Sequence, residues 1–333
     1  MNKISKEQFT AVLLISDIFA MLCIKGSISA FTSVGFITGI IFSFALLIPF
    51  IRYCQKGGTF GKCGKFTAFL YLCYIIFSGS NIFSMIWNTS EVIYIPYENN
   101  GLYGKILISA VIAVSCIYIS SCGIKALARS AVIAMSFGTL CIIIVTVSAL
   151  MKSEWNNFAL AENSGNLYAD FIKGCAWSCN IGVLMVFSES LQDDITDSLF
   201  FYFTFKVLLF TVILLVTVLV SGGIMKVTDF PVVTSAQISQ PFSVQRIDSL
   251  FLIVFSVFAV FSVAVQTSSA INILKEIFPN FVKFRNSAVL AVMILTALVP
   301  FDDTFRFSAN VIFMFTAPVV YFLKNKNPLT VRG

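Results

Sequence analysis

The sequence predicts an all-α integral membrane protein whose ten transmembrane helices form two inverted halves of five. Composition is the first observation: apolar residues make up 58% of the 333 residues and charged residues only 11%, against roughly 25% charge in soluble domains. Long apolar runs are the second, and the odd number of runs in each half is the third. A soluble globular protein is excluded.

Ten apolar runs are long enough to be membrane spans. A helix needs about 20 mostly apolar residues, at a rise of 1.5 Å each, to cross the hydrocarbon core. On that template one transmembrane domain fills residues 1–333. Its spans are predicted at residues 8–24, 31–51, 66–87, 105–121, 131–151, 171–190, 199–221, 249–271, 286–300 and 306–323.

The basic residues predict the orientation. Loops that remain in the cytoplasm carry an excess of Lys and Arg. With both termini inside, 15 of the 22 basic residues fall on the inner side, Lys206 among them as part of the sixth connection, and seven fall outside. Both termini are therefore predicted to be cytoplasmic, and the long connection 222–245 is predicted to pack over the outer face. The acidic connection 189–197 is assigned to the inside.

Five spans in each half mean that the second half enters the membrane from the side opposite to the first. The first repeat covers about residues 8–151 and the second about 171–323. In transporters built this way, the first helix of each half is unwound near the midplane and binds substrate and ions there. The corresponding positions are Asp17 in the first span and Asn180 to Gly182 in the sixth.

Asp17 is the most informative residue of the first span. A carboxylate at the bilayer centre costs about 2.5–3.5 kcal/mol on insertion scales, so it must face a bundle interior, a partner or water. A ligand or ion site is one interpretation, and a polar residue satisfied by a neighbouring hydroxyl is the other. Gly182 likewise fits either a binding site or close helix packing.

Two further spans carry polar residues in otherwise apolar surroundings. The third contains Ser80 and Asn81, and the eighth contains Ser262 and Gln266. Hydrogen bonds between membrane helices explain such groups at about 0.6 kcal/mol each. A site formed by spans one, three, six and eight is the alternative that the inverted repeat favours.

Several classes of function are made improbable by composition. Histidine is absent, which removes the commonest general base and a common metal ligand, so we expect no enzyme, no metal and no cofactor. The nine cysteines are scattered and have no metal-type spacing. The net charge of +6 reflects basic residues between apolar runs, so nucleic acid is not an expected partner.

Four segments resemble the spore germination permease family, the B subunits of nutrient germinant receptors in the amino acid/polyamine/organocation superfamily. They are ISKEQ at 4–8, GIKALAR at 123–129, the segment from Pro241 through QRID at 245–248, and PFDD at 300–303. They occur in order across nearly the whole chain. The resemblance implies a ten-span fold of the LeuT type.

The resemblance also implies a function, a ligand and partners. Such subunits sense a small nutrient, usually an amino acid, and work with an A-type and a C-type receptor subunit at the spore inner membrane or cell membrane of a spore-forming bacterium. The family's pocket lies between spans one, three, six and eight. It corresponds here to Phe19, Ala20, Ser80, Asn81, Gly182, Ser262 and Gln266.

A working transporter is the alternative function. It would move an amino acid or amine with protons or sodium, and Asp17 would be the titrating or coordinating group. Both functions need the same pocket and the same alternating states, so the sequence leaves them open.

Overall fold

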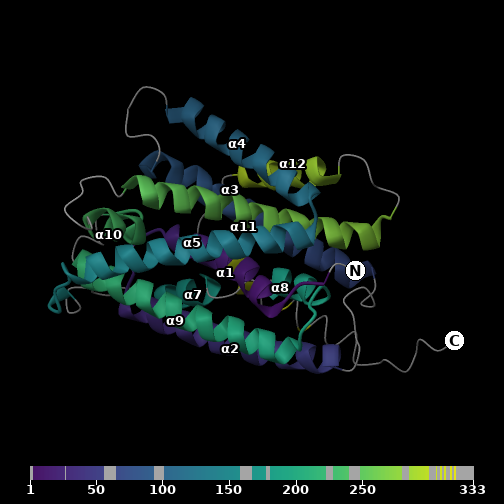
Figure 1. Cartoon of the computed structure of the whole chain (residues 1–333), viewed down its shortest axis with the longest axis horizontal. Coiled ribbons are helices and arrows are strands. Elements are labelled where there is room, and N and C mark those ends of the chain that lie inside the picture. The colour runs from purple at the N-terminus through teal and green to yellow at the C-terminus, as the bar shows by residue number, and fades with distance from the viewer. Residues whose placement is uncertain are drawn as a thin grey trace.

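A computed structural model describes the chain over residues 3–26, 28–55, 65–93, 101–157, 167–177, 181–222, 228–239, 248–279 and 285–299, with a few residues between 305 and 319. The named elements of this part are all helices (Figure 1). The first five are α1 (Lys6–Leu22), α2 (Ala30–Gln55), α3 (Lys65–Ile93), α4 (Gly101–Ser121) and α5 (Ile124–Leu150). The others are α7 (Leu167–Trp177), α8 (Ile181–Ser188), α9 (Ile195–Ser221), α10 (Pro231–Ser239), α11 (Asp248–Ile277) and α12 (Arg285–Ala297).

The helices identify a multi-pass membrane protein. Within the described residues, six helices are long and apolar enough to cross a bilayer, namely α2, α3, α4, α5, α9 and α11. Their outward faces expose large apolar side chains, with Ile133 73%, Leu208 63% and Tyr118 71% exposed. Soluble monomers rarely show such continuous apolar surface, whereas lipid requires it. The all-α membrane class is confirmed.

The predicted spans correspond to helices at nine of their ten positions, with ends that differ by a few residues. The helices usually extend further than the apolar runs, as in α3 and α11, because polar end residues still continue the helical hydrogen bonds. The tenth predicted span, 306–323, lies mostly outside the described residues. The ten-span repeat therefore stays a prediction.

Of the two helix breaks expected near the midplane, the one in the sixth predicted span falls at residues 178–180, which lie outside the described residues. On either side of them, α7 ends at Trp177 and α8 begins at Ile181. The first span is not unwound: α1 continues as a helix through Asp17 to Leu22, so that expectation was wrong. The physical reason is that the Asp17 side chain bonds to another helix instead of to its own backbone.

The N-terminus and the acidic connection 189–197 lie on the same face of the bundle. The Ile4 amide donates to the Ser190 carbonyl at 2.8 Å, and the Lys6 amide donates to the Asp193 carboxylate at 2.7 Å. Ser5 caps α1 in a capping box with Gln8, so the free amides of the first turn are satisfied. Asp193 therefore has a structural role as a partner of α1.

The opposite face is covered by α10, drawn at the other end of the bundle from the N-terminus (Figure 1). This short helix packs against α5 and α9, and its own side chains Val232 and Val233 are buried. The Gly26 amide donates to the Asp229 carbonyl at 2.8 Å, which ties the α1–α2 turn to the same segment. The described part of 222–245 thus packs over this end of the bundle, as predicted.

Helices α2 and α7 are in direct backbone contact. A Cβ atom at Gly174 would lie 2.2 Å from the Thr32 carbonyl oxygen, and one at Gly35 would lie 2.3 Å from the Phe171 carbonyl oxygen. The Cys175 thiol donates to the Gly35 carbonyl at 3.1 Å. Small residues permit such an approach in membrane helices, and they fix α7 against α2.

Candidate functional site

A buried ion pair joins α1 to α9. The Lys206 ammonium donates to the Asp17 carboxylate at 2.7 Å and to the Tyr202 phenol oxygen at 3.1 Å. The Tyr202 hydroxyl donates to the same oxygen of Asp17. Tyr202 and Lys206 are one helical turn apart, so both side chains leave α9 on one face. A carboxylate, an ammonium and a phenol thus form one compact cluster.

The surroundings of this cluster are apolar and closed to solvent. The side chain of Lys206 is 0% exposed and that of Asp17 is 5% exposed. The Lys206 ammonium also lies over the rings of Tyr202 and Phe210, at 5.4 and 5.8 Å from the ring centroids. In a low-dielectric interior these contacts offset part of the cost of taking both charges out of water.

The ion pair decides between the two interpretations of Asp17 in this conformation. Asp17 is satisfied by a neighbouring helix, through an ammonium as well as through a hydroxyl. A ligand ammonium or a metal cation could bind the carboxylate only if Lys206 moved away. The protein therefore supplies its own cation at this position.

Lys206 was wrongly assigned to the sixth connection by the sequence analysis. It lies eleven residues inside α9, about 16 Å from the start of that helix, so it is not a loop residue. Its removal leaves 14 basic residues on the predicted inner side and seven outside, and the excess that predicts the orientation is kept. A lone Lys inside an apolar run was the available signal, because such a residue requires a buried partner.

The four predicted spans do meet. Helix α11 packs against α1, α3 and α8, and α8 also packs against α1 and α3. Phe19 is fully buried in α1 and its ring lies 5.1 Å from that of Phe255 in α11. Ala20 beside it is half-buried. Spans one, three, six and eight are therefore neighbours, although α1 joins α11 here through apolar packing.

Two buried amides on these helices have unpaired polar atoms. Gln266 in α11 is 0% exposed, and neither its Oε1 nor its Nε2 has a hydrogen-bond partner. Asn81 in α3 is 7% exposed and its Nδ2 is unpaired. Helices α3 and α11 both contact Met293 of α12. A Cβ atom at Gly79 of α3 would lie 2.5 Å from the Met293 sulfur, and the Thr267 hydroxyl of α11 donates to the same sulfur at 3.9 Å. The two amides thus lie within one helical turn of a common contact.

The other predicted site residues are occupied within the protein. The Ser80 hydroxyl donates to the Phe77 carbonyl, and the Ser262 hydroxyl donates to the Phe258 carbonyl. Such bonds to the preceding turn satisfy a hydroxyl in a membrane helix. A Cβ atom at Gly182 would lie 2.5 Å from the Tyr74 ring, so the packing interpretation of this glycine has direct support. Asn180 lies outside the described residues.

The predicted site residues therefore fall into two groups. Asp17 belongs to the α1–α9 ion pair, while Asn81 and Gln266 belong to the α3–α11 contact. Phe255, the partner of Phe19, precedes Gln266 by eleven residues, which is about 16 Å of helix. The sequence predicted a single site between these neighbouring helices, whereas the structure places its residues in two groups.

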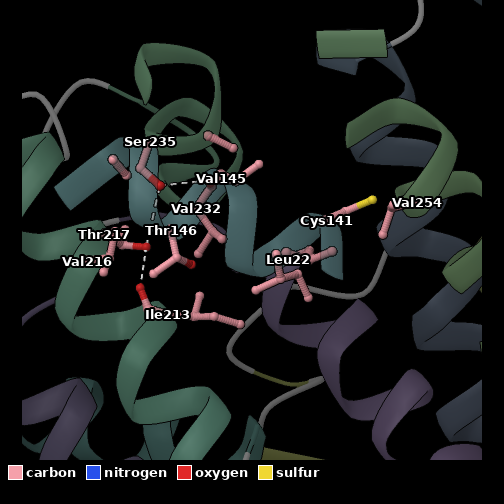
Figure 2. A pocket seen from close by; sticks show the side chains of 13 residues that line it. Leu22, Cys141, Val145, Thr146, Ile213, Val216, Thr217, Val232, Ser235 and Val254 are labelled. Atoms are coloured by element: carbon pink, nitrogen blue, oxygen red, sulfur yellow. Dashed lines mark hydrogen bonds between the residues drawn. The ribbon is translucent and has the colours of Figure 1, made fainter. Parts of the chain in front are cut away.

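Figure 2 shows a small pocket beneath α10, between α5, α9 and the end of α1. Its lining is mostly apolar, with Leu22, Val232 and Val254 among the side chains, and its volume is about 50 Å³. The Thr217 hydroxyl donates to the Ile213 carbonyl, and the Ser235 hydroxyl lies 3.5 Å from the Thr217 hydroxyl. A water molecule occupies about 30 Å³ of liquid, so this pocket is too small for an amino acid.

No protein-family model matches the chain, and no curated protein sequence matches it significantly.

Proposed function

We propose that this chain is a nutrient-sensing membrane subunit of the germinant-receptor type, with a ten-span LeuT-type fold, that binds a small amino-acid-like ligand between α1, α3, α8 and α11. The single observation that carries the proposal is the Gln266 side chain. It is fully buried on α11, the helix that packs against α1, α3 and α8, and neither polar atom of its amide has a hydrogen-bond partner.

Unpaired buried amides favour a polar ligand. Each unsatisfied donor or acceptor costs about 1–3 kcal/mol, and Gln266 and Asn81 together present three such atoms. A ligand with an α-carboxylate and an α-ammonium offers acceptors and donors to match them. The stabilisation gained on binding would draw α3 and α11 onto the ligand.

The contacts of the two helices in the sixth predicted span suggest which element responds. Helix α7 is fixed to α2 by backbone contact, whereas α8 is only eight residues long and packs against α1, α3 and α11. A ligand shifts an equilibrium only by its differential affinity for two states. We assign that difference to α8, whose end carries the acidic connection, and we propose that A-type and C-type subunits respond to the bound state.

Binding by purified protein in lipid nanodiscs tests the proposal. A panel of amino acids is screened by thermal stabilisation, since a ligand present at about 100 times its Kd adds about 2.7 kcal/mol of stability. Gln266→Leu is expected to abolish the shift. Gln237→Leu makes the same chemical change at an exposed position of α10 and is the matched control. Failure of every amino acid to stabilise the wild-type protein, or an unchanged shift in Gln266→Leu, contradicts the proposal.

Coupled transport is the second candidate function, and the ion pair separates it from sensing. A sodium ion at Asp17 would compete with the ammonium of Lys206, so ligand binding by a receptor with this fixed pair is expected to be the same in sodium and in choline buffers. The protein alone in liposomes is expected to bind ligand without concentrative uptake. Uptake driven by a sodium or proton gradient would favour the transporter.

A further inference from the structure

A polar cavity opens at the face of the bundle that carries the N-terminus. Its volume is about 410 Å³, and its walls come from the α4–α5 junction, the end of α8 and the last turns of α11. Small-molecule sites occupy about 300–1,000 Å³, so a small organic ligand fits. The cavity is separate from the α1–α9 ion pair, since it shares no residue with that cluster.

Two carboxylates from different elements line this cavity. Glu189 follows the end of α8, and Glu276 lies in the last turn of α11. Their negative charges act on each other, and such repulsion is relieved by a cation between them. Lys275 also lines the cavity, and its positive charge is repelled by that of Arg285 on the neighbouring helix α12.

An unpaired hydroxyl points to a ligand independently of the charges. Ser268 lines the same cavity, is 5% exposed, and its Oγ has no hydrogen-bond partner. It lies two turns before Glu276 on α11, so the two side chains share one face of that helix. At Gly123, on the opposite wall, a Cβ atom would meet nothing within 4 Å, which leaves space for a ligand.

The chemistry of the lining selects the ligand class. Among the described residues no group of three or more Asp, Glu, Cys or His could hold a metal ion. Two carboxylates with a serine and Asn272 instead match an organic ammonium with a second polar group. We propose that this cavity binds a primary ammonium ion, held by Glu189 and Glu276 and by the Ser268 hydroxyl.

Ethanolamine is the probe, because its head group is shared by a free amine and by phosphatidylethanolamine. Binding of labelled ethanolamine is measured on the full-length protein in nanodiscs of phosphatidylcholine, with and without phosphatidylethanolamine. Saturable binding in pure phosphatidylcholine supports the proposal. Loss of that binding when phosphatidylethanolamine is present identifies the lipid head group as the occupant, and unchanged binding identifies a free amine.

Variants test the named residues. Glu276→Gln is expected to weaken ethanolamine binding by about tenfold or more, whereas Glu154→Gln, at an exposed position outside the cavity, leaves it unchanged. Ser268→Cys adds a readout that leaves both carboxylates in place. Its thiol is expected to react faster with a cationic thiosulfonate than with an anionic one, and ethanolamine should protect it.

Three results would overturn the proposal. They are the absence of saturable ethanolamine binding in both bilayers, unaltered binding by a monodisperse Glu276→Gln protein, and equal rates of the two reagents at position 268. If Glu276→Gln does not fold, the reagent rates in Ser268→Cys decide.

Discussion

The ion pair between Asp17 and Lys206 gives the sharpest test of the structure, because removal of either partner leaves a buried charge alone. At 2.7 Å and an effective dielectric constant of 20, the gross attraction is about 6 kcal/mol. Desolvation offsets much of it, and removing one partner of a buried pair typically costs about 3–5 kcal/mol. We expect Lys206→Met and Asp17→Asn each to destabilise the protein by that amount.

The double variant distinguishes pairing from general damage. With both charges gone, no ion remains in the apolar interior, so Asp17→Asn with Lys206→Met should be more stable than the sum of the single losses by at least about 2 kcal/mol. Tyr202→Phe removes the hydrogen bond to the carboxylate and the one accepted from Lys206, leaves both charges in place, and should cost about 1–3 kcal/mol. The three residues are expected to behave as one coupled unit.

Thermal unfolding in detergent, followed by size-exclusion chromatography, measures these losses. A loss of 3–5 kcal/mol corresponds to a fall of about 4–7 °C in Tm for a chain of this size. Lys125→Met and Tyr118→Phe make the same changes at exposed positions and should stay within about 1 °C. Additive effects of Asp17→Asn and Lys206→Met, or single shifts no larger than these controls, would refute the pairing.

Three other predictions follow from packing and topology. In the same unfolding assay, Gly182→Ala should lower the free energy of unfolding by about 1–3 kcal/mol, because its Cβ would lie 2.5 Å from the Tyr74 ring. Adding Tyr74→Leu should restore part of that loss. An unchanged stability of Gly182→Ala would contradict this packing. Gly174→Ala should lower the stability more than Gly182→Ala does, since its Cβ would lie 2.2 Å from an α2 backbone carbonyl oxygen, which cannot rotate away as a side chain can. A smaller loss than for Gly182→Ala would show that α7 can move off α2. Cysteines at the exposed positions Lys3 and Gln237 should react with impermeant reagents from opposite sides of the membrane, and labelling of both from one side would contradict the bundle.

Most of the helix positions could be predicted from the sequence, because the bilayer imposes one length and one polarity on every span. The continuity of α1 through Asp17 could not. A polar residue in a membrane helix either bonds to its own backbone or reaches another helix, and the local sequence is the same in both cases.

The ion pair itself was beyond a reading of the sequence for a related reason. Asp17 and Lys206 are 189 residues apart, and nothing along the chain says which of 22 basic residues faces a given carboxylate. The orientation rule counts every Lys and Arg as part of a connection between spans, so a Lys that lies inside a span is assigned to the nearest connection. The physical cost of a lone buried ammonium is the constraint that the count omits.

The structure separates a fixed part of the bundle from a part that can respond to a ligand. The ion pair holds α1 to α9, and backbone contact holds α7 to α2. Between them α8 is short and ends where the Ser190 carbonyl accepts the amide of Ile4. Two of the buried polar groups without internal partners, the Gln266 amide and the Ser268 hydroxyl, lie on α11, which packs against α8. A ligand that satisfied either group would act on the α8–α11 contact, and through α8 on the acidic connection and the N-terminus.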